Sequence, residues 1–249
     1  MTDFSDTLRT WRKARRFSQL ELALEADVSA RHISFLESGR SAPSIDMVAR
    51  LGDALQMPLS ARNQMLAGAG FAHRYPARAW DDAALQPIRA AVSRMLTGHM
   101  PYPGISADGM WRIVELNPAA KVLFSQFGAG VGDSLLDLLL GDDVRAAVEN
   151  WDEVANHTAQ RLRTESAAMG GVKAFDEAAE KLSDAAPYYT PSEHSVIPTV
   201  FQLGDLRLSL FSTIAQFGTP EDVTLDAFKV ELYFPSDEAS ERLLNQLAH

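Results

Sequence analysis

The sequence predicts an all-α N-terminal domain of five helices, followed by an α+β C-terminal domain built on an antiparallel sheet. Three observations lead to this fold class. Apolar residues recur at helical spacing through residues 1–70, a segment rich in Gly, Pro and aromatic residues interrupts that spacing, and apolar and polar residues alternate with period two in the last third. A length of 249 residues is typical of two domains. We therefore expect domains at 1–70 and 83–249, joined by a linker at 71–82.

Composition limits the functions that the chain can have. The sequence contains no cysteine, which excludes disulfide scaffolds, Cys-ligated metal sites and thiol nucleophiles. It shows neither an apolar leader nor a stretch long enough to span a membrane, so we expect a cytoplasmic protein without membrane contact. The net charge is −10, but residues 1–70 carry nine basic against eight acidic side chains. The acidity therefore belongs to the C-terminal part and does not oppose nucleic-acid binding by the N-terminal part.

The first two predicted helices follow from spacing and capping. Phe4, Leu8 and Trp11 lie at positions i, i+4 and i+7 and share one face of a first helix. Ser18 and Glu21 form a capping-box pattern, in which each side chain accepts a hydrogen bond from the backbone N–H of the other residue. A second helix is therefore expected to begin directly after Ser18.

Three more helices complete the predicted N-terminal domain. Ser29 can cap a third helix, which turns Ile33 and Leu36 inward and ends at Gly39. Pro58 separates a fourth helix from a fifth. The residues expected to be buried on these last two helices are Met47, Val48, Leu51, Leu55, Met65 and Leu66.

The C-terminal domain begins with helices and ends with strands. We expect a helix from 85 to 96, a strand over 110–116, and further helices over 119–124, 135–140, 144–156 and 174–182. From 196 to 234 the period of two predicts antiparallel strands, each with one apolar face. Gly204 and Asp205 suit a two-residue type II′ hairpin, because glycine adopts positive φ at the first turn position without steric cost.

The second and third helices have the spacing of a helix-turn-helix, whose second helix can lie in the major groove of DNA. The candidates for base contacts, on or near its outer face, are Ala30, Arg31, His32 and Ser34. Arg31 can bridge O6 and N7 of guanine. The candidates for phosphate contacts, which set the register from helix ends, are Gln19, Ser29 and Arg40. Capping by Ser29 is compatible with such a contact.

The segment SQLELALEADVSARHISFLESGRSAPS resembles the XRE-type helix-turn-helix of Cro and phage-repressor domains, and the resemblance covers residues 5–68. It implies an ion pair between Arg12 and Glu37 with a structural role. Asp27 stands where that family often has glycine, and aspartate tolerates the left-handed conformation better than most residues. Two roles stay open for Phe35, contact with thymine methyl groups or packing against neighbouring helices.

Four segments of the C-terminal part, GFAHRYP, HMPYPGISADGMWRIVELN, NWDEVA and FGTPEDVTLDAFKVELYFPSDEAS, resemble the MmyB-like regulators. The resemblance implies a PAS-like ligand-binding domain that holds an elongated apolar molecule, such as a fatty acid, between helices and sheet. The apolar strand faces of 206–210 and 228–234 are expected to border this cavity. The wall candidates are Trp111, Asn117, Asn150, Trp151, Leu210, Phe211 and Thr213. Core packing would explain the tryptophans without a ligand, and helix capping before Pro118 would explain Asn117.

Together these resemblances imply a transcription regulator, in the simplest case a repressor, that binds a double-stranded DNA operator as a homodimer and senses a small apolar effector. No catalytic or metal-binding residue is assigned, because the sequence has no H-E-x-x-H, G-x-S-x-G, Walker A or G-x-G-x-x-G pattern. No cofactor is expected apart from a bound fatty acid or similar apolar ligand. Three alternatives stay open: a protein-interaction or dimerisation domain without a small ligand, a haem or flavin sensor, and an enzyme with a regulatory DNA-binding domain.

Overall fold

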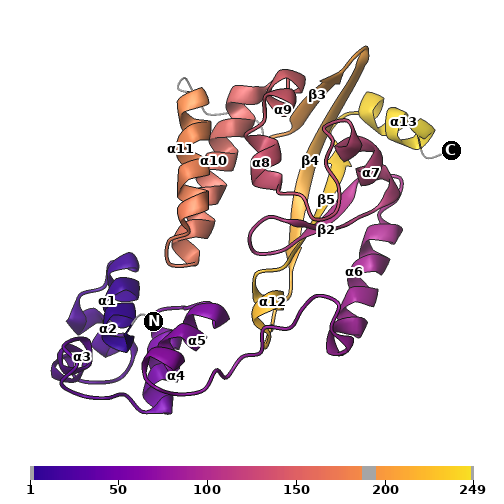
Figure 1. Cartoon of the computed structure of the whole chain (residues 1–249). Coiled ribbons are helices and arrows are strands. Elements are labelled where there is room, and N and C mark those ends of the chain that lie inside the picture. Colours follow the sequence, from indigo (N-terminus) through magenta and orange to yellow (C-terminus); the bar gives the residue numbers. More distant parts are fainter. Residues whose placement is uncertain (1–2, 187–194, 248–249) are drawn as a thin grey trace. The chain divides into compact units, whose positions relative to one another are not determined.

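The structure is a computed structural model that describes residues 3–186 and 195–247. The chain forms two compact units, whose elements are labelled in Figure 1. Unit 1 comprises residues 1–77, 163–176 and 220–226, and unit 2 comprises residues 78–162, 177–219 and 227–249. Unit 1 thus takes in two short segments from the second half of the chain.

Unit 1 is built on five α-helices, as the sequence predicts. They are α1 (Phe4–Ala14), α2 (Gln19–Glu25), α3 (Ala30–Glu37), α4 (Ile45–Ala54) and α5 (Leu59–Gly68). Their apolar faces meet in one core, which includes Leu8, Ile33, Leu36 and Leu51. Serine side chains cap three of these helices, namely Ser18 with its complete capping box, Ser29 and Ser44.

The turns on either side of α3 use the left-handed backbone conformation. Asp27, between α2 and α3, has φ 50°, and Gly39, after α3, has φ 70°. Aspartate tolerates this region better than most residues, and glycine has no Cβ to clash there. The turn that the sequence indicates at Asp27 is therefore confirmed, as is the end of the third helix at Gly39.

The segment 220–226 caps a helix of unit 1. Pro58 precedes α5 and supplies no capping side chain, which leaves the first N–H groups of that helix without a local partner. Asp226, in α12 (Val223–Asp226), accepts a hydrogen bond of 2.8 Å from the backbone N–H of Leu59. The carboxylate also suits the positive end of the helix dipole.

Arg15, directly after α1, satisfies carbonyl groups at two helix ends. Its guanidinium donates to the carbonyls of Leu55 and Gln56 after α4, and to those of Ala167 and Ala168 in the last turn of α10 (Trp151–Ala168). The last carbonyls of a helix have no intrahelical partner and carry partial negative charge, so an arginine there is stabilising. Arg15 thereby holds segment 163–176 within unit 1.

Unit 2 contains one antiparallel sheet with the strand order β2-β1-β5-β4-β3. The strands are β1 (Gly104–Ala107), β2 (Ile113–Leu116), β3 (Thr199–Leu203), β4 (Leu206–Gln216) and β5 (Lys229–Pro235). The predicted hairpin is confirmed, since Gly204 has φ 62° in the turn between β3 and β4. The expected fold class, a five-helix domain followed by an α+β domain with an antiparallel sheet, is confirmed as well.

Two expectations about unit 2 need correction. The strand expected over 110–116 begins only at Ile113, because Trp111 belongs to a turn closed by a hydrogen bond from its N–H to the Asp108 carbonyl. The helix expected over 144–156 is interrupted at Val148, which is extended and pairs with Phe201.

Helices flank the sheet on both faces. The helices that follow α5 are, in chain order, α6 (Gln86–Gly98), α7 (Pro118–Ser125), α8 (Leu135–Leu139), α9 (Asp142–Ala147), α10, α11 (Lys173–Ala185), α12 and α13 (Glu238–Leu247), with a 3-10 turn at Ala83–Leu85. α6 packs on the face that carries Phe228 and Val230, where Trp80 stacks on Phe228 with ring centroids 4.3 Å apart. α8, α9 and α10 lie on the other side of the sheet (Figure 1).

This arrangement corrects the expected role of the apolar face of 228–234. That face packs against α6, and β5 presents its other face, with Glu231 and Tyr233, to the cavity. Side chains of a strand alternate between its two faces, so the sequence shows which residues share a face. It does not show which helices cover that face.

Candidate functional site

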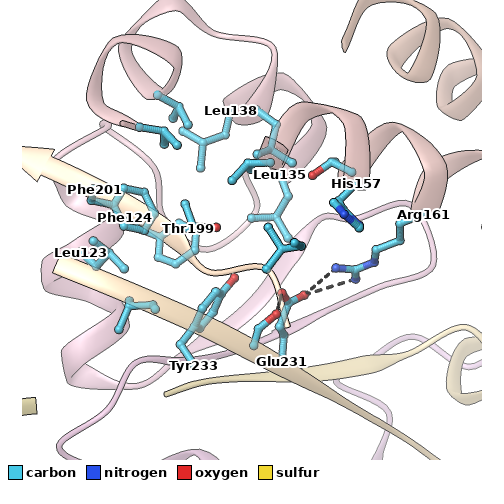
Figure 2. Close-up of a pocket in the computed structure, with 18 of the residues that line it drawn as sticks. Leu123, Phe124, Leu135, Leu138, His157, Arg161, Thr199, Phe201, Glu231 and Tyr233 are labelled. Atoms are coloured by element: carbon cyan, nitrogen blue, oxygen red, sulfur yellow. Dashed lines mark hydrogen bonds and ion pairs between the residues drawn. The ribbon is translucent and has the colours of Figure 1, made fainter. Parts of the chain in front are cut away.

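Unit 2 contains a partly open cavity of about 580 Å³ between the sheet and its covering helices. Most of the wall is apolar, and α7, α8 and β3 contribute Leu123, Phe124, Leu135, Leu138 and Phe201 to it (Figure 2). Small-molecule sites in proteins have volumes of roughly 300–1,000 Å³ and are lined mainly by apolar side chains with a few polar groups. The cavity has the size and lining of such a site.

One end of the cavity is polar. Arg161 of α10 pairs with Glu231 of β5, and its two terminal nitrogens lie 3.2 and 3.3 Å from Oε2 (Figure 2). The second carboxylate oxygen accepts a hydrogen bond of 2.7 Å from the hydroxyl of Ser212 on β4. The Arg161 and Glu231 side chains are only 29% and 14% exposed, so the pair is largely withdrawn from water. Desolvated charges require such partners, because neither charge is stable there alone.

Trp111 lies against the guanidinium of Arg161. The Arg161 Cζ is 4.3 Å from the centroid of the Trp111 ring, a cation–π contact. Trp111 has φ 61°, and this conformation costs about 1–3 kcal/mol for a residue with a side chain. Asp108 fixes the turn, because its carboxylate accepts hydrogen bonds from the backbone N–H groups of Met110 and Arg112. The turn therefore imposes the position of the ring against Arg161.

Tyr233 of β5 lines the same end of the cavity. Desolvation raises the pKa of its hydroxyl well above the ordinary value, and the negative charge of Glu231 raises it further, while Arg161 opposes these effects. A hydrogen bond with Glu231 raises the pKa as well, so the hydroxyl is protonated at physiological pH, directs its hydrogen to Glu231 and keeps an oxygen that can accept.

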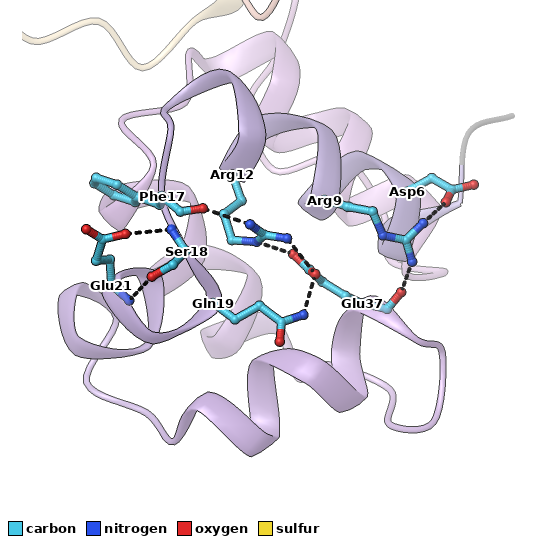
Figure 3. A network of polar contacts seen from close by, with 8 residues as sticks. All are labelled: Asp6, Arg9, Arg12, Phe17, Ser18, Gln19, Glu21 and Glu37. Atoms are coloured by element: carbon cyan, nitrogen blue, oxygen red, sulfur yellow. Dashed lines mark hydrogen bonds and ion pairs between the residues drawn. The ribbon is translucent and has the colours of Figure 1, made fainter.

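In unit 1, Glu37 at the end of α3 is the centre of a polar network (Figure 3). Arg12 of α1 donates to both carboxylate oxygens, over 2.6 Å from Nε and 2.9 Å from Nη2. Gln19 of α2 donates to the second oxygen over 2.8 Å, and Arg12 also donates to the carbonyl of Phe17. The network joins the three helices of the helix-turn-helix region. The ion pair that the resemblance implies is present.

Burial and pairing act in opposite directions on the Glu37 carboxyl. Desolvation alone would raise its pKa, but the hydrogen bonds from Arg12 and Gln19 and the charges of Arg12 and Arg9 outweigh it, so the pKa is lowered. The Glu37 side chain is 4% exposed and that of Arg12 is 12% exposed, so solvent screens their interaction little. The pair therefore stabilises the helix-turn-helix as long as Glu37 is ionised.

The outer face of α3 carries the residues expected to meet DNA. Ser29, Arg31 and Arg40 are exposed, and Ala30, His32 and Ser34 are half-buried. The Cζ atoms of Arg31 and Arg40 lie 5.2 and 6.0 Å from the Phe35 ring centroid, so both cations are in contact range of this ring. Gln19 uses one of its two amide hydrogens in the bond to Glu37, which leaves the other available.

Comparison with protein families identifies the C-terminal part. The family model described as MmyB-like transcription regulator ligand binding domain matches residues 88–247, which is more than half of the chain. The chain belongs to the MmyB-like transcription regulators. A helix-turn-helix family model matches residues 8–61, so this MmyB-like regulator combines a DNA-binding domain with a ligand-binding domain.

The PAS domain of BvgS from Bordetella pertussis is similar in structure, with a TM-score of 0.31 and 14% sequence identity over 64% of this chain and 94% of that chain. The comparison with curated proteins gives no match. Within the described part of the MmyB-like regulator, no helix is long and apolar enough to cross a membrane. The same residues contain no group of three or more His, Asp or Glu side chains placed to hold a metal ion.

The structure places Trp111 and Leu210 in the wall of the cavity, as expected for the ligand site of this regulator. Phe211 and Thr213 alternate with the lining residues of β4 and lie on the opposite face, where Phe211 stacks on Phe234 with centroids 5.6 Å apart. Their assignment to the wall is wrong by one position along the strand.

The two asparagines expected in the wall have structural roles instead. Asn117 caps α7 by accepting from the N–H of Ala120 over 2.9 Å, and it also bonds three backbone groups near the start of β1 and the end of α6. Asn150 accepts from the N–H of Val200 over 3.0 Å and donates to the carbonyl of Pro198 over 2.8 Å. Backbone groups thus use both amides, which explains their positions without a ligand.

Trp151 is also absent from the cavity wall. It begins α10 and is 8% exposed, with an indole N–H that has no hydrogen-bond partner among the described residues. The packing interpretation therefore holds for Trp151.

The polar end of the cavity was not expected from the sequence. Its residues are His157, Arg161, Ser212, Glu231 and Tyr233. Charged residues on a helix and a strand are usually solvated, and nothing in their spacing indicates that α10 and β5 face each other. One pattern could have found Glu231, since a charged residue inside an otherwise apolar strand is a candidate for a buried polar site.

Proposed function

We propose that this MmyB-like regulator is a repressor controlled by a small apolar ligand, which binds in the cavity of unit 2. The observation that carries the proposal is the cavity itself, which combines a ligand-sized apolar volume with a buried polar end in the domain that the family model describes as ligand-binding. A fatty acid or a molecule of similar shape is the first class to test. We propose no resident cofactor and no catalysis.

We further propose that α3 reads operator DNA from the major groove. Arg31 and Ser34 would contact base edges, with Ala30 and His32 beside them, since all four lie on or near the outer face of α3. Exposed Ser29 and Arg40 would contact phosphates from the two ends of this helix. The remaining amide hydrogen of Gln19 can add a phosphate contact from α2.

The regulator would act as a homodimer. A single recognition helix contacts few base pairs, whereas two copies related by a two-fold axis bind two half-sites and multiply their specificity. Size-exclusion chromatography with light scattering on the full chain, with and without operator DNA, tests this part. A monomer that occupies a single half-site would contradict it.

Ligand control is tested by extraction and by affinity. The full chain is purified, denatured in organic solvent, and the extract is analysed by mass spectrometry for a bound apolar molecule. Operator affinity is then measured with the recovered molecule and with a panel of fatty acids and of the alcohols and amides that have the same chains. We expect a shift of about 1–3 kcal/mol, the usual size of coupling between two sites. An empty extract, together with unchanged operator affinity across the panel, would favour a protein-interaction domain instead.

A further inference from the structure

At the polar end of the cavity, Arg161 and Glu231 are already paired with each other. Arg161 lies 3.2 Å from Oε2 of Glu231 and packs on the Trp111 ring. The other oxygen of Glu231 accepts from Ser212 over 2.7 Å. The two charges therefore satisfy each other within the wall before any ligand enters.

This pairing disfavours a charged ligand head of either sign. A carboxylate that approached Arg161 would lie beside the carboxylate of Glu231, and the two would repel each other in surroundings that water screens poorly. An ammonium group that approached Glu231 would likewise be repelled by the positive charge of Arg161. A charged head would also lose its own hydration. Arg161 and Glu231 are already engaged with each other, so neither compensates that loss.

The same end offers good partners to an uncharged polar head. Elsewhere in the wall, the cavity is lined by the hydroxyl-bearing side chains of Thr158, Ser195 and Thr199. Tyr233 keeps its proton, because desolvation raises the pKa of its hydroxyl. Hydroxyl groups donate and accept, so they can bond an alcohol, a ketone or an amide without a charge on either side.

We infer that the Arg161–Glu231 pair selects ligands with an apolar body and an uncharged hydrogen-bonding head, and rejects the corresponding acids and amines. The inference rests on the proposed function, since it concerns the ligand of the same cavity. It narrows the ligand class, because a free fatty acid would be a poor ligand and its alcohol or amide a good one. The pair is then the specificity-determining element of the cavity.

The test uses three ligands with the same apolar chain: 1-decanol, decanoic acid and decylamine. Binding to the full wild-type chain is measured near neutral pH by calorimetry. We expect the alcohol to bind at least about tenfold more tightly than the acid or the amine, a difference of about 1.4 kcal/mol. Equal or tighter binding of the acid overturns the inference, and binding of the acid at His157, the other ionisable residue of this wall on α10, would give that result.

Two variants reverse the selection if the inference is correct. Glu231→Gln removes the negative charge that would repel an acid from Arg161, so the acid should gain at least about tenfold in affinity and exceed the alcohol. Arg161→Gln removes the positive charge that would repel an amine from Glu231, so the affinity of the amine should rise by a similar factor and exceed that of the alcohol. The matched control is Glu149→Gln, which removes the acid of an exposed ion pair with Arg207 outside the cavity and should leave the order of the three ligands unchanged. If either reversal fails in a variant that melts cooperatively, the pair does not determine specificity.

The extraction experiment separates this inference from the proposed function. Recovery of an apolar molecule with a free carboxylate or amine would support ligand sensing and overturn the selection by the ion pair. An empty extract with no binding of any of the three ligands to folded wild-type protein would overturn both. Recovery of a neutral lipid-like molecule supports both.

Discussion

Glu37 stabilises unit 1 through charges that are almost fully enclosed. It accepts hydrogen bonds from Arg12 and Gln19 and joins α1, α2 and α3. Removing one partner of an enclosed pair leaves the other charge without compensation. The structure therefore assigns Glu37 a role in the stability of the DNA-binding domain, although it lies close to the proposed DNA-reading face.

We expect Glu37→Ala to lower the free energy of unfolding by about 3 kcal/mol, because Arg12 loses both of its carboxylate contacts. Urea denaturation and thermal melting of the full chain measure this effect. Asp6→Ala, which removes an exposed partner of Arg9, is the control and should change stability by less than about 0.5 kcal/mol. Unchanged stability of Glu37→Ala, combined with loss of DNA binding, would place Glu37 directly at the interface.

The lowered pKa of Glu37 also predicts an acid dependence of stability. The ionised form is the stabilising one, so its contribution is complete above the ordinary glutamate pKa of about 4.3 and is lost as pH falls through the lowered value. Glu37→Gln cannot lose a charge on acidification. The melting temperature of the wild type should therefore approach that of Glu37→Gln as pH falls from about 5 to 3. A constant difference between the two proteins over this range would contradict the assignment.

Arg31 is the residue whose replacement should change sequence specificity. It is exposed on α3, and its guanidinium lies over the Phe35 ring, which restricts its orientation before DNA binds. Arg31→Ala should cost about 1–3 kcal/mol on the operator and much less on random DNA, because base contacts carry the sequence information. Arg40→Ala should weaken binding to both DNAs alike. Fluorescence anisotropy at fixed salt distinguishes the two cases, and equal losses for Arg31→Ala would make it a phosphate contact.

At the scale of elements, the sequence was most informative where local rules decide the structure. The caps at Ser18 and Ser29 and the left-handed turn at Asp27 depend on neighbouring residues, and all three were predictable. β1 was missed because all four of its residues are buried, so no alternation marks it. The interruption at Val148 depends on pairing with Phe201, which is remote in sequence.

The candidate site was less predictable than the fold for the same reason. The alternation along β4 was visible, but its direction relative to α10 depends on packing between distant segments. Leu210 was assigned correctly to the cavity, and Phe211 and Thr213 were assigned to the wrong face. Arg161 and Glu231 meet only in the folded chain, and nothing local in either residue indicates the pair.

The two faces of β4 can be tested by a pair of adjacent substitutions. Ser212→Phe would place a ring in the cavity and should weaken ligand binding by more than about tenfold, since the ring and the ligand compete for the same volume. Thr213→Phe introduces the same ring one residue later, at an exposed position on the opposite face, and should leave ligand affinity unchanged. Equal effects of the two variants on calorimetric affinity would show that the ligand lies elsewhere.

At the scale of the whole molecule, the course of α10 bears on how a ligand could control DNA binding. α10 is one uninterrupted helix from Trp151 to Ala168. Its residues up to Leu162, including Arg161 in the cavity wall, belong to unit 2, and its last turns belong to unit 1. A ligand changes operator affinity only if it binds the DNA-competent and DNA-incompetent states unequally. We propose α10, whose sequence continues from one unit into the other, as the element through which that difference arises.

Arg15 provides the corresponding test of coupling. It donates to the carbonyls of Ala167 and Ala168 at the end of α10 and to those of Leu55 and Gln56 after α4. Arg15→Ala removes the fixation of α10 within unit 1 and leaves the cavity residues untouched. We therefore expect ligand affinity within about twofold of wild type, while the ligand-induced shift in operator affinity, about 1–3 kcal/mol, falls by at least half. Lys13→Ala removes the same charge from an exposed position of α1 and serves as the control. A full ligand response in Arg15→Ala would show that the coupling does not pass through the end of α10.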